Sequence, residues 1–291
     1  MREGALLHGP AGWGEFSPFA EYGPAESSRW LASAIEAASA GWPAPLRDRV
    51  GVNVTVPAVG PAEAARIVVA SRCVTAKVKV AEPGQGEADD LDRVAAVRDA
   101  LGPGGRIRVD ANGGWDVDQA ALMLGRLRRY GLEYAEQPCA TLGDLARLRR
   151  LTDVPLAADE SIRKASDPLA VRAAGAADIV VLKVAPLGGV RLALQVAEAC
   201  GLPVVVSSAV DTSVGLAAGV ALAAALPELK YDCGLATMAL LEGDVTADPL
   251  LPDHGKLPVR PAVVDSGRLA AFEADPGPWR DRALAAAEYL R

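Results

Sequence analysis

Several residue types that support common functions are scarce in this chain of 291 residues. Only two histidines, His8 and His254, are present, and neither follows a nucleophile-like turn, which argues against a Ser-His-Asp hydrolase. The four cysteines lie far apart, without Cys-x-x-Cys spacing and with little histidine nearby, so a structural zinc site is not indicated. We interpret them as reduced core residues of a cytoplasmic protein.

Positive charge and long apolar runs are also limited. The net charge is −7 and the sequence pI is near 5.0, whereas nucleic-acid binding needs a concentrated basic face. The longest uncharged apolar stretch, residues 214–226, has 13 residues and is too short to span a bilayer. His8, Gly9 and Pro10 interrupt the apolar run at the N-terminus, unlike in a secretory signal. We therefore expect neither a nucleic-acid partner nor a membrane partner.

The middle of the chain alternates short apolar, β-branched runs with amphipathic segments, which predicts strands and helices in turn. The predicted strands are 51–56, 75–80, 106–110, 132–136, 154–159, 178–183, 202–207 and, more weakly, 229–233. The clearest predicted helices are 89–101, 116–130 and 189–200. In the last, Leu192, Val196 and Cys200 recur at intervals of four, which predicts that they share one buried face.

This rhythm favours an α/β barrel with a parallel sheet over residues 49–239. An open, doubly wound sheet has a similar pattern, but its glycine-rich phosphate turn is absent, because the glycines at 102–105 precede a strand. Residues 1–48, with a helix predicted at about 24–40, and residues 240–291, which end in a predicted helix, do not follow the rhythm. We expect both ends to form one smaller domain that caps the barrel mouth.

Three acids stand at the ends of successive predicted strands: Asp110, Glu136 and Asp159, spaced by 26 and 23 residues. Active sites lie at this end of parallel barrels. Acids after strands also cap helices, but glutamate is a poor cap and Pro138 follows Glu136. Neighbouring strands are ~5 Å apart, so the carboxylates would repel each other unless a cation binds. Oxygen ligands suit Mg²⁺, and the sequence therefore predicts that the three acids are its ligands.

Lysine is rare, because only six of the 30 basic residues are lysines, and three of the six fall on these strands. Arginine keeps its proton in proteins, whereas lysine can release it. Lys77 and Lys79 alternate on the strand before Asp110 and so share one face. Lys79 is expected to meet the substrate, Lys77 to support it, and Lys183 to lie across the mouth. Lys79 and Lys183, as amines on either side of a cation, would suit the removal of a proton α to a carboxylate. An ion-pair network between the lysines and the acids would use the same residues.

The motifs Lys77-Val-Lys79, Asp110-Ala-Asn112, Glu136-Gln-Pro138, Asp159-Glu160-Ser161 and Lys183 resemble those of the muconate-lactonizing subgroup of the enolase superfamily. Within this subgroup, GWGEFSPFAEY (12–22) and SSAVDTSVGL (207–216) are most similar to the o-succinylbenzoate synthase family. The resemblance implies a (β/α)7β barrel, a modified TIM barrel, with an α+β capping domain and Mg²⁺ as cofactor. Members begin with a further strand and a mobile loop before the position of Met1, so the cap is expected to be truncated here.

The resemblance further implies a lyase of menaquinone biosynthesis. Its reaction is the syn dehydration of 2-succinyl-6-hydroxy-2,4-cyclohexadiene-1-carboxylate to 2-succinylbenzoate. Lys79 would act as base and then as acid, and Lys183 would stabilise the enediolate by a cation–π contact. Asn112 and Glu160 would support the site, and Ser207, Ser208 and cap residues around 16–22 would line the succinyl side. Turn formation explains the two serines equally well.

Other functions use the same scaffold. An N-succinylamino acid racemase would employ Lys79 and Lys183 as opposed bases, and the catalytic residues do not separate it from the dehydratase. A dipeptide epimerase is disfavoured, because Asp232-Cys-Gly234 lacks the second acid of an Asp-x-Asp motif. The intact lysines and carboxylates disfavour a non-catalytic binding homologue.

Overall fold

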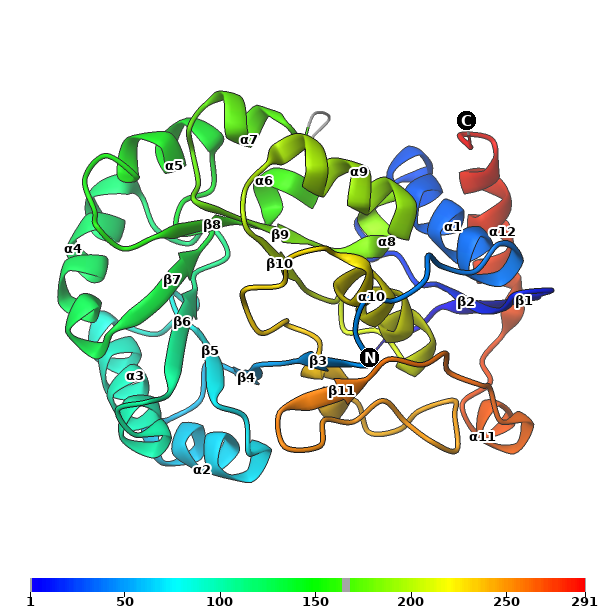
Figure 1. The fold of residues 1–291 in the computed structure, drawn as a ribbon, viewed down its shortest axis with the longest axis horizontal. Coiled ribbons are helices and arrows are strands. Elements are labelled where there is room, and N and C mark those ends of the chain that lie inside the picture. The colour runs from blue at the N-terminus through cyan, green and yellow to red at the C-terminus, as the bar shows by residue number, and fades with distance from the viewer. Residues whose placement is uncertain (1, 164–167, 291) are drawn as a thin grey trace.

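A curled parallel sheet forms the centre of the computed structural model, which describes residues 2–163 and 168–290 (Figure 1). Seven strands lie in the order β10-β9-β8-β7-β6-β5-β4. Their bounds are β4 (Val54–Val56), β5 (Thr75–Lys79), β6 (Arg106–Asp110), β7 (Leu132–Glu136), β8 (Leu156–Ala158), β9 (Ile179–Leu182) and β10 (Val204–Val206). Because the order is sequential without a reversal, the doubly wound alternative is excluded.

The eighth predicted strand, 229–233, is reduced to isolated bridges. Cys233 pairs in parallel with Val52, and Gly234 pairs in parallel with Ser207. One short segment therefore contacts the chain just before β4 and just after β10. The backbone amide of Asn53 also donates to the carbonyl of Cys233 at 2.9 Å.

The prediction of one strand over 51–56 was wrong. The structure divides it into β3 (Arg49–Gly51) and β4, and β3 pairs with β11 (Lys256–Pro258) in an antiparallel ribbon outside the large sheet. The division falls at Asn53, which is buried and whose side-chain oxygen accepts a hydrogen bond from Arg108 Nη1 at 3.0 Å. This polar contact replaces the apolar packing that a continuous strand would have.

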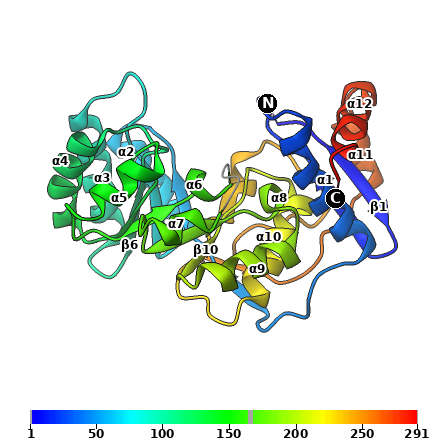
Figure 2. The same cartoon turned by 90° about the horizontal axis from the view of Figure 1, so that it is seen from above.

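The longer helices lie along the outer side of the sheet, and two short helices, at 160–163 and 184–187, begin directly after the ends of β8 and β9 (Figures 1 and 2). They are α2 (Pro61–Ser71), α3 (Glu87–Leu101), α4 (Val117–Leu127), α5 (Leu142–Leu148), α6 (Glu160–Arg163), α7 (Ala170–Ala173), α8 (Val184–Leu187), α9 (Val190–Cys200) and α10 (Ser213–Ala225), with short 3₁₀ turns η1 (Arg128–Tyr130) and η2 (Ala236–Leu240). Side chains of Asp116, Thr141 and Thr212 cap α4, α5 and α10. The predicted helices 89–101, 116–130 and 189–200 therefore exist with small shifts at their ends.

The predicted buried face of α9 was right for Cys200, partly right for Val196, which packs half-buried against the core, and wrong for Leu192. Leu192 is 48% exposed, whereas Val190, Ala193, Ala197 and Cys200 form the buried face. Two alanines at the centre of this face allow close packing, which a rule based on large apolar side chains misses. All four cysteines are buried thiols. No helix within residues 2–163 and 168–290 is long and apolar enough to cross a membrane.

The two ends of the chain lie side by side (Figures 1 and 2). The N-terminal end contributes a hairpin, β1 (Ala5–Gly9) and β2 (Gly12–Phe16), which the sequence did not predict, and the expected helix α1 (Pro24–Ser39). The C-terminal end contributes α11 (Ser266–Ala271) and α12 (Pro276–Ala287), and Trp279 of α12 packs edge-on against Phe16. Glu36 of α1 accepts a hydrogen bond of 2.5 Å from Val190 N at the start of α9.

The close contact of β2 with α1 depends on Gly14. A Cβ atom at this position would overlap the carbonyl oxygen of Ala34. We expect Gly14→Ala to lower the free energy of unfolding by about 1–3 kcal/mol, because backbone on both sides resists displacement. Gly125→Ala is the matched control, since Gly125 lies exposed in α4 with open space around it, and alanine there should stabilise by about 0.5–1 kcal/mol. Urea unfolding of both variants measures the difference, and equal stability of Gly14→Ala and wild type would contradict the packing.

Candidate active site

The strand-end acids and the lysines all continue the inward-facing positions of the curled sheet. Tyr134, Ala157, Ile179, Val181 and Val205 form a cluster of their own, separate from the core that the sheet shares with its helices. Because side chains alternate along a strand, Glu136, Asp159 and Lys183 follow Tyr134, Ala157 and Val181 on the same face. Arg108 stacks over the Tyr134 ring at 4.8 Å, which places Asp110 on this face too.

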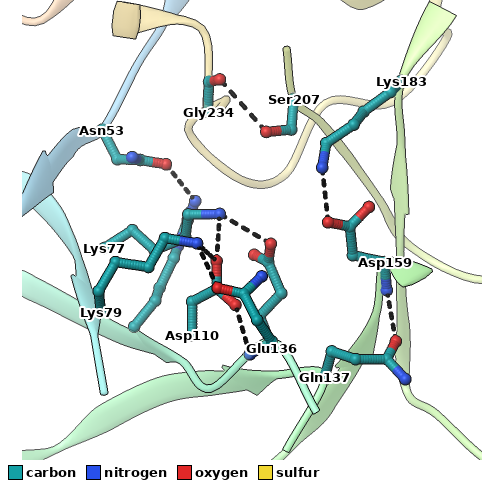
Figure 3. Close-up of polar contacts among 12 residues, drawn as sticks. Asn53, Lys77, Lys79, Asp110, Glu136, Gln137, Asp159, Lys183, Ser207 and Gly234 are labelled. Atoms are coloured by element: carbon teal, nitrogen blue, oxygen red, sulfur yellow. Dashed lines mark hydrogen bonds and ion pairs between the residues drawn. The ribbon is translucent and has the colours of Figure 1, made fainter. Parts of the chain in front are cut away.

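Three lysines bind the three carboxylates (Figure 3). Lys77 Nζ lies 2.9 Å from Asp110 Oδ2 and 2.7 Å from Glu136 Oε1. Lys79 Nζ lies 2.6 Å from the same Asp110 oxygen, and Lys183 Nζ lies 2.5 Å from Asp159 Oδ2. The structure thus brings together, at one end of the sheet, the six side chains that the sequence predicted to lie there.

Burial and mutual proximity set the protonation of this group. Burial would raise the pKa of Asp110, but the charges of Lys77 and Lys79 lower it well below its usual range. For Lys77 the two effects have the opposite signs: burial would lower its pKa, but Asp110 and Glu136 raise it well above the ordinary value. Burial together with the charge of Asp110 raises the pKa of Glu136 to about 7, although Lys77 opposes the change. Glu136 is therefore less well stabilised as a carboxylate than Asp110.

The donor set fits a hard divalent cation. Asp110, Glu136 and Asp159 offer only oxygen, which suits Mg²⁺. Asp159 Oδ1 is buried and accepts no hydrogen bond, although Arg163 Nε lies 3.5 Å away. Among the described residues, no three His, Cys, Asp or Glu side chains already converge as a cation cage, because each acid is turned towards a lysine. The three acids could hold a cation once their side chains turn from the lysines towards each other.

Polar residues that follow the strand ends hold the acids in place. Asn112 accepts from Lys79 Nζ at 2.7 Å and donates to Glu160 Oε1 at 3.2 Å, so both supporting residues predicted from the sequence lie beside the site. Sequence reasoning had assigned no role to Gln137, which is fully buried. Its Oε1 accepts from the backbone amide of Asp159 at 3.0 Å and fixes the start of α6. Asn112 and Gln137 both have positive φ, so each strand end turns sharply.

A small pocket of about 20 Å³ lies beside Lys183, between the sheet and the N-terminal end. Ser207 and Ser208 line it, and both also form hydrogen bonds: Ser207 Oγ donates to Gly234 O at 3.3 Å, and Ser208 Oγ pairs with Thr237 Oγ1 at 2.6 Å. Phe16 was expected to line this side as well. It is instead fully buried in a cluster with Tyr22 and Trp30.

Glu15, the neighbour of Phe16, lines the pocket, because alternation along β2 turns it to the opposite face. Its carboxylate accepts from the backbone amides of Thr212 and Gly215, both at 3.1 Å, at the start of α10. Burial and the charge of Asp211 raise its pKa to about 7. Sequence reasoning gave this residue no role, although a lone acid in the Gly-Trp-Gly-Glu-Phe stretch was a usable signal. Glu15 thus connects the N-terminal hairpin to the loop that carries the two serines.

Comparison with known proteins agrees with this geometry. Residues 61–263 match a family model described as enolase C-terminal domain-like, and residues 1–38 match one described as enolase N-terminal domain-like. The chain is 68% identical to the o-succinylbenzoate synthase of Thermobifida fusca, over 98% of this chain and 90% of that protein. It is 56% identical to the o-succinylbenzoate synthase of Mycolicibacterium smegmatis, over 98% of this chain and 89% of that protein.

A solved structure shares the fold. The muconate lactonizing enzyme from Pseudomonas fluorescens, complexed with muconolactone, superposes with a TM-score of 0.76 at 27% identity, covering 88% of this chain and 74% of that chain. The two family models together extend over most of the sequence, and the relatives match nearly from end to end. The chain therefore belongs to the enolase superfamily and, within it, to the o-succinylbenzoate synthase family.

Proposed function

We propose that the site catalyses the o-succinylbenzoate synthase reaction of menaquinone biosynthesis, the lyase activity for which its relatives are named. The observation that carries the proposal is the position of Lys79 and Lys183, which bind acids on different strands around one group of carboxylates. This arrangement leaves an amine on either side of a carboxylate substrate. The reaction is the loss of water from 2-succinyl-6-hydroxy-2,4-cyclohexadiene-1-carboxylate, which gives 2-succinylbenzoate.

Asp110, Glu136 and Asp159 would hold Mg²⁺. When bound, the cation would neutralise the charge that develops on the substrate carboxylate as the α proton leaves. Asn112 and Glu160 keep the site ordered through their hydrogen bond of 3.2 Å. Lys77, held by two buried acids, supplies fixed positive charge behind Lys79.

Lys79 moves the proton in this proposal. In its neutral form it takes the proton α to the carboxylate, and it then returns a proton to the hydroxyl group, which leaves as water from the same face. The ring becomes aromatic and the lysine ends as it began. Its side chain is 29% exposed, more than that of Lys77 or Lys183, which suits contact with a substrate. Lys183 would stabilise the intermediate by a cation–π contact.

The fold and the division of the chain fit this assignment. We infer a (β/α)7β barrel over 49–239, capped by an α+β domain built from 1–48 and 240–291. The parallel bridges at Cys233 and Gly234 support closure of the barrel, and the contact between Phe16 and Trp279 supports a cap formed by both ends. Ser207 and Ser208, which line the small pocket beside Lys183, would contact the succinyl group.

N-succinylamino acid racemisation is the second candidate, because Lys79 and Lys183 could act as opposed bases. Measuring kcat/KM for the cyclohexadiene substrate and for N-succinyl amino acids separates the two activities. We expect the dehydration value to be the larger.

Lys79→Ala should lower kcat for dehydration by about 10³-fold or more, because Lys77, the neighbouring amine, is held by two buried acids and cannot take its place. Circular dichroism should show an unchanged fold. Lys256→Ala, at an exposed lysine on β11, is the matched control and should keep full activity. Appreciable turnover by Lys79→Ala would remove this residue from its role.

Lys183→Arg should abolish racemisation yet leave part of the dehydration activity. Arginine cannot act as a base, but it keeps a cation beside the ring. Both activities are measured on the same preparation. Racemisation at the wild-type rate would exclude Lys183 as a base.

Mg²⁺ should raise the melting temperature of the protein, because a ligand that binds only the folded state stabilises it. Treatment with EDTA should abolish turnover, and added Mg²⁺ should restore it. Asp159→Asn should lose the thermal shift. Asp232→Asn should keep it, since Asp232 bonds to Thr75 and Arg106 at the other end of the strands. An unchanged Mg²⁺ response in Asp159→Asn would contradict the ligand assignment.

A further inference from the structure

A buried ion pair lies behind the strand that carries Lys79, and the proposed mechanism does not use it. Asp90 and Arg93 of α3 are only 3% and 1% exposed, and Arg93 Nη1 lies 2.8 Å from Asp90 Oδ1. Burying two charges is costly, and such pairs often stabilise a fold no better than apolar residues of similar size would. Stability alone therefore does not explain why this ion pair lies beside the strand that carries Lys79.

This pair binds the main chain at both sides of Val80. Arg93 Nη1 donates to the carbonyl of Lys79 at 2.9 Å, and Asp90 Oδ2 accepts from the amide of Ala81 at 2.9 Å. Arg93 Nε also donates to the carbonyl of Val59, in the loop after β4, at 2.7 Å. The two side chains thus join the end of β5, the helix behind it and the neighbouring loop.

The backbone needs this support because β5 ends here. Ala81 has a φ of 60°, in the left-handed region that alanine rarely adopts, so the chain turns sharply two residues after Lys79. Residues held in such conformations persist only where surrounding contacts fix them. Asp90 and Arg93 supply hydrogen bonds at both sides of Val80.

We propose that Asp90 and Arg93 are positioning residues that fix the backbone of Lys79 so that its Nζ meets the substrate proton. This inference rests on the proposed role of Lys79. Lys77 is buried and held by two carboxylates, whereas the more exposed Lys79 must move between its partners and the substrate. A fixed backbone is then the main restraint on where the amine can reach, and a misplacement of about 1 Å can slow a reaction by about 10²-fold.

Arg98 provides a matched control on the same helix. It donates from Nη1 to the carbonyls of Gly102 and Gly105, both at 2.8 Å, and from Nη2 to the carbonyl of Tyr130 at 2.7 Å. These contacts also tie α3 to the main chain, but at its opposite end, near the start of β6. A merely structural role would make the two arginines equivalent.

The test compares Arg93→Ala with Arg98→Ala at saturating Mg²⁺. We expect both variants to lower the melting temperature. Arg93→Ala should lower kcat by about 10²-fold with little change in KM, whereas Arg98→Ala should keep kcat within about twofold of wild type. Equal kcat in the two variants would overturn the proposal.

Chemical rescue gives a second readout. A hollow of about 150 Å³ reaches Arg93 between Gln85, Asp89 and Asp92, so small cations can enter the space left by the side chain. Methylguanidinium should restore kcat of Arg93→Ala at least about tenfold, and it should leave Lys79→Ala inactive. Failure to rescue Arg93→Ala would contradict a positioning role.

If Arg93→Ala does not fold, Arg93→Lys keeps the charge beside Asp90 but loses the forked donors. It should lower kcat by about tenfold or more at unchanged KM, and a wild-type kcat would refute the inference. The proposed function is tested separately, because turnover by Lys79→Ala would remove the base itself. An inactive Lys79→Ala beside a fully active Arg93→Lys would refute the positioning role alone.

Discussion

Repulsion among three carboxylates at the ends of neighbouring parallel strands is the constraint on which this site depends. Parallel strands bring their last residues within ~5 Å of each other, so Asp110 and Glu136 are adjacent by register. Both are almost fully buried, and burial strengthens their repulsion. The ammonium groups of three lysines offset this charge in the structure. A divalent cation would take over that role where a lysine turns to the substrate or releases its proton. The same balance that stabilises the folded site prepares it to bind a negatively charged substrate.

Contacts from distant parts of the chain hold the carboxylates and lysines of the candidate site in position. Glu15 and Glu36 of the N-terminal end accept hydrogen bonds from the starts of α10 and α9, where helix dipoles favour an anion. Gln137, at the end of the neighbouring strand β7, accepts a hydrogen bond from the backbone amide of Asp159 and so fixes the turn that carries it. On the outer side, Arg93 holds the carbonyl of Lys79. The side chains of the candidate site are thus held by the N-terminal end of the chain, by the neighbouring strand and by the surrounding helices.

The sequence was sufficient for the six strands from β5 to β10 and their terminal acids, because alternation and spacing are local properties. Lys183, for example, follows Ile179 and Val181 at intervals of two, and this pattern alone turns it inward. The hairpin over 5–16 was not predictable in this way, since three glycines weaken its strands and its half-buried side chains give no clear alternation. Glu15 was missed because its partners lie about two hundred residues further along the chain. Such pairings depend on tertiary structure, which local patterns do not encode.

The most direct test of the account is a crystal structure with Mn²⁺ in place of Mg²⁺, located by its anomalous scattering. The account predicts one strong peak bonded to an oxygen from each of Asp110, Glu136 and Asp159, with Lys79 and Lys183 on opposite sides of it. A peak bonded elsewhere, or acids that keep their lysine contacts and exclude the ion at saturating Mn²⁺, would contradict it.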